Sequence, residues 1–186
     1  MDMSVICALG ANLSGDQGDP VDTLSAALCE LVNKDFSLVS VSRFWRTPAY
    51  PVGSGPDYAN ACCKLQSPSD PRATLDAFHD IEAQCGRVRE ARWGARTLDL
   101  DLIAYGNIVL PDLQGFAQWR DLPLSRQQSI APTELILPHP RLQDRAFVLI
   151  PLAEIAPLWR HPVSGQTVRQ MLAALPEAQK AAIHPV

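Results

Sequence analysis

The sequence predicts a single α+β domain over residues 1–186 with a ferredoxin-like fold, in which two helices cover one face of an antiparallel sheet and functional loops border the other, open face. Hydrophobic patterns follow the order strand, helix, strand, strand, helix, strand over residues 5–105, which is the order of the split β-α-β fold. The chain of 186 residues is long enough for one domain with a substantial core and too short for two typical ones.

The composition limits the possible functions. A hydrophobic content of 47% is typical of a globular protein, and the net charge of −4 argues against broad nucleic-acid binding. No apolar run reaches the length of a membrane span, and the N-terminus has no basic leader. The five cysteines form no Cys-x-x-Cys pair, as expected for buried thiols. We therefore expect a cytoplasmic protein without nucleic-acid or membrane partners.

The first elements are a strand, a loop and a helix. Residues 5–9 are wholly apolar and indicate a buried strand. The glycine-rich loop 10–18 resembles a phosphate cradle, but it lacks the Gly-Lys-Ser/Thr ending of a P-loop and is interpreted as a connection. Asp19 and Pro20 are an N-cap followed by proline at the first helical position, so a helix is predicted to about Lys34.

Two strands follow. Residues 36–46 are rich in strand-forming residues, and residues 47–56 form a long loop of a kind that is often functional. The next predicted strand, 58–65, places Asn60 on the same face as Tyr58. Asn60 is either a polar residue that faces solvent or a buried amide that a heterocyclic substrate could satisfy.

The second helix begins with the same device, Asp70 followed by Pro71, and Gly86 suits the position just after its end. Glu82 lies at the margin of the apolar stripe of this helix. Two interpretations of Glu82 remain open, namely a pair with a neighbouring arginine and a contact with substrate.

The last strand, residues 97–105, alternates so that Asp99 and Asp101 share a face, about 7 Å apart along the strand. An acidic solvent face is the simplest interpretation. However, the preceding residues 86–96 hold four arginines, which suit phosphate oxygens, and Mg²⁺ binds through one or two carboxylates plus substrate phosphates. The stretch therefore favours a site for a metal-bound nucleoside triphosphate.

The remaining chain is less regular. Residues 111–134 are polar, contain three prolines and are interpreted as an extra loop segment. Residues 142–155 predict a helix interrupted near Pro151, and residues 167–175 predict a short amphipathic helix. His139, which lies between two prolines, is either structural or, together with Arg145, part of a site.

Taken together, these residues resemble the 6-hydroxymethyl-7,8-dihydropterin pyrophosphokinases of folate biosynthesis. The resemblance rests on four blocks, which are residues 8–13, residues 44–48 with 56–60, residues 81–101 and residues 137–157. The most specific part is Arg92-Trp-Gly-Ala-Arg-Thr-Leu-Asp-Leu-Asp101. The family has a ferredoxin-like fold and transfers the β,γ-pyrophosphoryl group of ATP to the hydroxymethyl oxygen of the pterin, which gives AMP and the pterin diphosphate.

The resemblance implies a role for each polar residue of the blocks. It implies two Mg²⁺ ions on Asp99 and Asp101, and Glu82 on the nucleotide side. The residues implied in phosphate contacts are Arg87, Arg89, Arg96, His139 and Arg145, while Trp93 would help to close the arginine loop. The residues implied in the pterin pocket are Tyr58, Asn60 and Phe147, with Phe147 stacking on the ring.

The sequence departs from the family at several positions. The arginine loop is one residue shorter than a common form, Ala95 replaces a frequent proline, and Ala11 replaces the usual serine. Residues 111–134 exceed the family connection by roughly twenty residues, judged from the motif spacing. This segment could form a lid, an oligomer contact or a docking surface for another folate-pathway enzyme.

Two other classes of function are compatible with parts of the pattern. A nucleotide-sugar transferase also uses Asp-x-Asp with a metal, but it would need a sugar-nucleotide domain for which this chain is small. A ferredoxin-like binding module could hold a nucleotide without turnover. The complete set of aspartates, arginines and His139 favours the enzyme.

Overall fold

The computed structural model describes residues 3–49, 55–86, 97–123, 126 and 130–186. Its strands are β1 (Met3–Ala11), β2 (Ser37–Val41), β3 (Trp45–Thr47), β4 (Tyr58–Ser67), β5 (Asp99–Tyr105) and β6 (His184–Pro185). Its helices are α1 (Pro20–Asn33), α2 (Pro71–Gln84), α3 (Leu113–Arg120), the 3₁₀ helix η1 (Leu142–Asp144), α5 (Ala146–Ile155), α6 (Val168–Ala174) and α7 (Glu177–Lys180).

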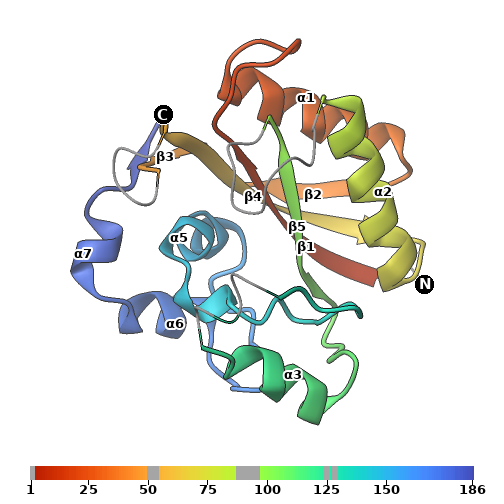
Figure 1. The fold of residues 1–186 in the computed structure, drawn as a ribbon, viewed down its shortest axis with the longest axis vertical. Helices are drawn as coiled ribbons and strands as arrows, with labels where there is room; N and C mark the ends of the chain where they lie inside the picture. Colours follow the sequence, from red (N-terminus) through yellow and green to blue (C-terminus); the bar gives the residue numbers. More distant parts are fainter. Residues whose placement is uncertain (1–2, 50–54, 87–96, 124–125, 127–129) are drawn as a thin grey trace.

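The strands form one antiparallel sheet in the order β5-β1-β4-β3-β6, and β2 also pairs with β4 (Figure 1). Helices α1 and α2 lie on one face of this sheet. The two central strands, β1 and β4, are the first and third of the predicted strands. This arrangement confirms the ferredoxin-like α+β fold.

Both long helices begin as predicted. The Asp19 side chain accepts hydrogen bonds from the backbone N–H groups of Val21 and Asp22, and Pro20 occupies the first turn. Asp70 caps α2 in the same way, by accepting from the Ala73 N–H. Gly86 follows α2 with a φ of 76°, the left-handed conformation that favours glycine at the end of a helix.

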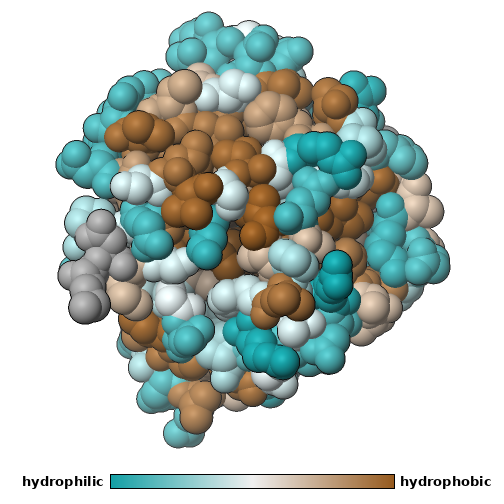
Figure 2. Space-filling view, turned by 180° about the vertical axis from the view of Figure 1, so that it is seen from behind, coloured by the Kyte–Doolittle hydropathy of each residue, from teal (hydrophilic) through white to brown (hydrophobic). Residues whose placement is uncertain are grey.

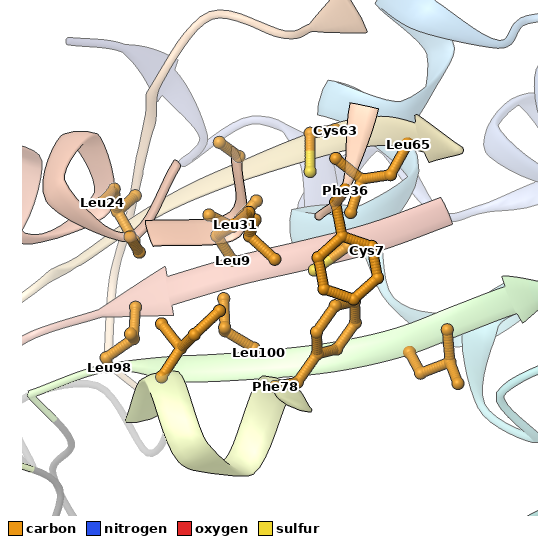
Figure 3. Close-up of a cluster of buried hydrophobic side chains, with 14 of the residues drawn as sticks. Cys7, Leu9, Leu24, Leu31, Phe36, Cys63, Leu65, Phe78, Leu98 and Leu100 are labelled. Atoms are coloured by element: carbon orange, nitrogen blue, oxygen red, sulfur yellow. The ribbon is translucent and has the colours of Figure 1, made fainter. Parts of the chain in front are cut away.

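The main core lies between the sheet and helices α1 and α2 (Figure 3). At its centre the rings of Phe36 and Phe78 pack at a tilted angle of 51°, with centroids 5.5 Å apart. Leu9 of β1 and Leu100 of β5 are buried in the same cluster. These side chains lie on the α1/α2 face, and the residues that alternate with them project from the other.

The other face is partly covered, which differs from the predicted open face bordered by loops. Helix α5 packs against it through Val148, Leu149 and Leu152, which join a second buried cluster with Ile6 and Ile103 of the sheet (Figure 1). The physical reason is that this face of the sheet carries apolar residues that must also be withdrawn from water. The carboxylate strand is therefore open on only part of this face.

The predicted strand 36–46 is divided into β2 and β3 at Ser42. The Ser42 hydroxyl accepts a hydrogen bond from the Cys62 N–H at 3.0 Å, where the strand ladder would continue. Next to it, Arg43 donates to Glu154 of α5 from both its backbone and its side chain. The Ser42 N–H still donates to the Cys62 carbonyl at 2.9 Å, so the Ser42 hydroxyl replaces only one of the two backbone bonds of this pair.

The segment 111–134 contains a helix, although its sequence lacks a clear period. Asp112 caps α3 by accepting from the Gly115 N–H, and Phe116 is fully buried. The Phe116 ring packs on His161, with centroids 5.7 Å apart, and His161 packs on Trp159. Tertiary contacts therefore stabilise a helix of eight residues whose sequence alone indicates a loop.

Helix α5 also differs from its prediction, because it continues through Pro151 and begins only after Arg145. An internal proline removes one helical hydrogen bond. The burial of three apolar side chains on the sheet outweighs this loss.

On the back of the molecule, hydrophobic residues gather in a broad area that hydrophilic residues interrupt (Figure 2). Exposed apolar side chains of the N-terminal half include Val32 at the end of α1 and Leu38 and Val39 of β2. Within the described ranges, no helix is both long and apolar enough to cross a membrane.

We expect Phe78→Ala to lower the free energy of unfolding by about 3–5 kcal/mol, because it removes a fully buried ring and leaves a cavity beside Phe36. Val32→Ala, at a position that is 50% exposed, is the matched control and should change it by less than about 0.5 kcal/mol. Urea unfolding of both variants tests the assignment, and similar losses would contradict it.

The packing of His161 predicts a pH dependence of stability. Burial lowers the pKa of His161 from its ordinary value of 6.5, and the nearby Arg120 lowers it further. The unfolded chain therefore binds a proton near pH 6.5 that the folded chain does not bind, so the free energy of unfolding should decrease as the pH falls below 6.5. Urea unfolding at several pH values should show a smaller decrease for His161→Gln, and identical decreases would refute the prediction.

Candidate active site

Two carboxylates share the face of β5 that α1 and α2 do not cover. Leu98, Leu100 and Leu102 are buried in the main core, so the alternating Asp99 and Asp101 project from the other face. Both aspartates remain partly exposed to solvent. The structure confirms the prediction that Asp99 and Asp101 lie on one face of the strand, opposite the leucines.

Small residues of β1 leave room beside the carboxylates. Ala8 pairs with Asp101 across the two strands, and Gly10 pairs with Asp99. Because neither residue has a side chain larger than a methyl group, a ligand can approach both carboxylates from the same side.

Arg145 places a positive charge next to the carboxylates. Its Nη1 donates to Oδ2 of Asp101 at 3.1 Å. Its guanidinium also lies over the ring of Phe147, with Cζ 5.6 Å from the ring centroid. Arg145 and Phe147 lie at the start of α5, so this helix brings a cation and an exposed aromatic ring to one edge of the site.

His139 is held beside this group as a neutral imidazole. Its backbone N–H donates to the carbonyl of Ile103 at 2.8 Å, and its Nδ1 accepts from the Arg141 N–H at 3.0 Å. Burial lowers the pKa of His139 well below its ordinary value, and the charge of Arg145 adds to this effect. Because Nδ1 is an acceptor, the proton of the neutral ring is on Nε2, which can donate to a phosphate oxygen.

Glu82 is buried and bonded to the carboxylate strand. Its Oε1 accepts from the backbone N–H of Leu100, the residue between the two aspartates, at 2.8 Å. Among the described strands β5 is an edge strand of the sheet, so this bond satisfies a donor at the edge. Glu82 therefore positions the strand, and its predicted contact with a nucleotide stays a prediction.

The predicted pterin residues lie on the same sheet face, around Gly10. Asn60 is buried and donates from Nδ2 to the hydroxyl of Thr47 at 2.6 Å, which excludes the solvent-facing interpretation. Its Oδ1 would lie 3.0 Å from a Cβ added at Gly10. Tyr58 pairs with Thr47 two residues before Asn60 on β4, and shares its face.

A cavity of about 370 Å³ opens beside the charged residues. Asp101, His139 and Arg145 are among its lining residues, together with Leu75 of α2 and Trp119 of α3. The predicted pterin residues Tyr58, Asn60 and Phe147 do not line it, and neither do Asp99 and Glu82. The structure thus brings only part of the predicted site to this cavity.

Several predicted residues lie outside the described residues, namely Arg87, Arg89, Trp93 and Arg96, together with Glu90, Ala91, Arg92 and Ala95 in the arginine loop. Among the described residues, no group of three or more His, Cys, Asp and Glu side chains converges as a metal site. A metal held by the two aspartates would therefore need oxygen ligands from a substrate or from water.

Sequence reasoning missed two residues near the site. Thr47 was assigned to a loop, although its position after a strand-forming run and its hydroxyl made it a candidate partner for Asn60. Trp119 lies in the segment interpreted as an extra loop, and no spacing in the sequence connects it to the aspartates. Only the folded chain brings it to the cavity.

A ferredoxin-like sheet that presents a pair of carboxylates beside a guanidinium and a neutral imidazole, with Asp101, Arg145 and His139 lining one cavity, defines an enzyme of the phosphotransferase type. The particular family follows from comparison with known proteins. The model of the 7,8-dihydro-6-hydroxymethylpterin-pyrophosphokinase (HPPK) family matches residues 6–157, and the chain belongs to this family.

Two relatives named 2-amino-4-hydroxy-6-hydroxymethyldihydropteridine pyrophosphokinase support the assignment. The chain is 38% identical to the one from Synechocystis sp. over 161 residues, which cover 86% of this chain and 72% of that protein. It is 36% identical to the one from Pseudomonas aeruginosa over 173 residues, which cover 92% and 91% of the two chains.

Solved structures support the fold. The wild-type HPPK-DHPS of Plasmodium falciparum matches with a TM-score of 0.63 and 13% sequence identity. A structure of a variant of that protein with pteroate matches with a TM-score of 0.64. The matches cover 93% of this chain but only 44% and 43% of those longer chains.

We expect Glu82→Ala to lower the free energy of unfolding by about 1–3 kcal/mol, because the buried N–H of Leu100 loses its acceptor. Glu82→Gln is the control, since an amide oxygen can still accept this bond. Urea unfolding of both variants measures the difference. An equal loss in both would show that the negative charge, not the bond to β5, is what matters.

Proposed function

We propose that this chain transfers the β,γ-pyrophosphoryl group of ATP to 6-hydroxymethyl-7,8-dihydropterin, giving AMP and the pterin diphosphate, as a step of folate biosynthesis. In this reaction the hydroxymethyl oxygen bonds to the β-phosphorus, the bond from that phosphorus to the α–β bridging oxygen breaks, and the hydroxyl proton is released. Membership of the pyrophosphokinase family supports the assignment. The observation that carries it is the cavity that Asp101 of the β5 carboxylate pair lines together with Arg145 and His139.

The donor set fits Mg²⁺. Asp99 and Asp101 offer hard oxygen ligands from one face of a strand, and the small residues of β1 leave space beside them. We assign two Mg²⁺ ions to these carboxylates, which is the finer part of the proposal. When bound there together with the triphosphate, the ions would neutralise its charge.

The remaining residues position the two substrates. The Nε2–H of His139 and the guanidinium of Arg145 are placed to donate to phosphate oxygens, and the predicted roles of Arg87, Arg89, Arg96 and Trp93 add to them. Such reactions depend mainly on position and charge stabilisation rather than on a strong base.

On the acceptor side, Asn60 supplies amide groups at the edge of a flat heterocycle, and Thr47 fixes which way the amide faces. We assign Tyr58 to the same pocket. The exposed ring of Phe147 is available to stack on the pterin.

Two further predictions concern the surroundings of the enzyme. All five cysteines are free and four of them are buried, which is consistent with the cytoplasmic location that we propose. Docking of another folate-pathway enzyme on residues 111–134 also stays a prediction.

Analysis of the nucleotide products tests the function. ATP, Mg²⁺ and 6-hydroxymethyl-7,8-dihydropterin should give AMP and pterin diphosphate in equal amounts. ADP would indicate an ordinary kinase and overturn the proposal. ATP binding without any product would favour the binding module.

Asp99→Asn and Asp101→Asn should each lower kcat/KM by at least about a hundredfold, because a metal ion contributes several kcal/mol to such reactions. The circular dichroism spectrum should not change, since both side chains are partly exposed. Unfolding of the variants would indicate a structural role for the carboxylates.

Gly10→Ala should weaken pterin binding by at least about tenfold, because the new methyl group would lie 3.0 Å from Oδ1 of Asn60 and displace the amide. Gly15→Ala is the control, since its methyl group would meet Thr97 Cγ2 at an ordinary 3.5 Å. Titration with the pterin measures the difference. Equal affinities of the two variants would argue against a contact between Asn60 and the pterin.

A further inference from the structure

The extra segment 111–134 contributes a wall to the cavity at the active site. Trp119 of α3, together with Ile130 and Pro132, lines the cavity, which residues of the main fold such as Leu75 of α2 also line. Trp119 is partly buried, whereas Leu113 of the same helix is 63% exposed. Helix α3 therefore presents the indole ring of Trp119 to the cavity.

The packing of helix α3 orients Trp119 toward the cavity. Phe116 is fully buried against His161, and residues three positions apart lie on the same face of a helix. The contact that buries Phe116 therefore also orients Trp119 toward the cavity. Arg120 lies near the Phe116 ring, with Cζ 6.0 Å from its centroid. Figure 1 shows α3 below the sheet, at the end where β5 finishes.

The lining of the cavity includes charged and apolar side chains. Asp101, His139 and Arg145 suit a metal-bound triphosphate. Leu75 and Trp119 are apolar, and Arg72, His79 and Glu134 also line the cavity. A nucleotide needs both kinds of contact, since a flat base is linked through a sugar to charged phosphates.

We propose that Trp119 is a binding residue for the nucleotide, and that it stacks on or against the base of ATP. This inference rests on the proposed function, which makes ATP the occupant of the cavity. The volume of about 370 Å³ lies within the range of small-molecule sites. The predicted pterin contacts Asn60 and Phe147 do not line this cavity, which favours the nucleotide over the pterin as its occupant.

Binding of ATP and of inorganic tripolyphosphate, each with Mg²⁺, tests the proposal on the full chain. Trp119→Ala should weaken ATP binding by about tenfold, within the range known for stacking of a base on an aromatic ring. It should leave the binding of tripolyphosphate, which has no base, unchanged. Trp119→Phe should recover most of the ATP affinity because it keeps a ring.

Two more variants distinguish a direct contact between Trp119 and the base from an effect on the folding of α3. Gln118→Ala changes the exposed neighbour of Trp119 on α3 and should leave both affinities unchanged. Phe116→Ala removes the anchor of α3 and should reproduce the loss that is specific for ATP. Circular dichroism confirms that each variant is folded.

Each of the following outcomes refutes the base contact, the proposed reaction or both. Unchanged ATP binding in Trp119→Ala, or an equal loss for tripolyphosphate, refutes the base contact. If the wild type binds ATP but forms no AMP, the proposed reaction fails while the base contact is still tested by the affinities. If the wild type does not bind ATP, both proposals fail.

Discussion

The alternation of β5 is the constraint on which the site depends. Its leucines fill the main core, and this burial forces Asp99 and Asp101 to the opposite face. A register shift of one residue would bury two charges and expose three leucines, so the pairing with β1 is strongly specified. The small residues of β1 keep the space beside the carboxylates open, and the bond from Leu100 to Glu82 fixes the strand at its edge. The same packing that stabilises the sheet therefore also positions the groups that are assigned to the metal.

Two groups beside the carboxylates differ in charge. The guanidinium of Arg145 pairs with Asp101 at 3.1 Å. His139 adds no positive charge, because burial and Arg145 together lower its pKa. A neutral imidazole beside Arg145 avoids repulsion between two cations and keeps an N–H donor available. In the proposed function, a metal-bound triphosphate at this site would meet a guanidinium and a neutral N–H donor.

Local rules in the sequence account for much of this fold. The Asp-Pro starts of α1 and α2, the positive φ of Gly86 and the facing of Asp99 and Asp101 follow from short-range chemistry, and the structure confirms them. The differences arise where distant residues decide the outcome. The strand is interrupted at Ser42 because its side-chain hydroxyl, rather than its backbone carbonyl, accepts the hydrogen bond from Cys62. Helix α3 forms because Phe116 packs on a histidine 45 positions later. For the same reason the sequence predicted the aspartates and Asn60 but not Trp119 or Thr47, whose relation to the site exists only after folding.

The start of α5 connects the two halves of the site. Arg145 pairs with Asp101 at the cavity, and two residues later Phe147 exposes its ring. The guanidinium of Arg145 lies over that ring, so the positions of the two groups are coupled. Glu154 near the other end of α5 accepts hydrogen bonds from Arg43, which precedes β3 and the Thr47 hydroxyl that binds Asn60. One helix therefore carries Arg145 and Phe147 at its start and binds the residue before β3 near its end. Because Val148, Leu149 and Leu152 pack on the sheet, the helix continues through Pro151 and keeps these contacts in one rigid element.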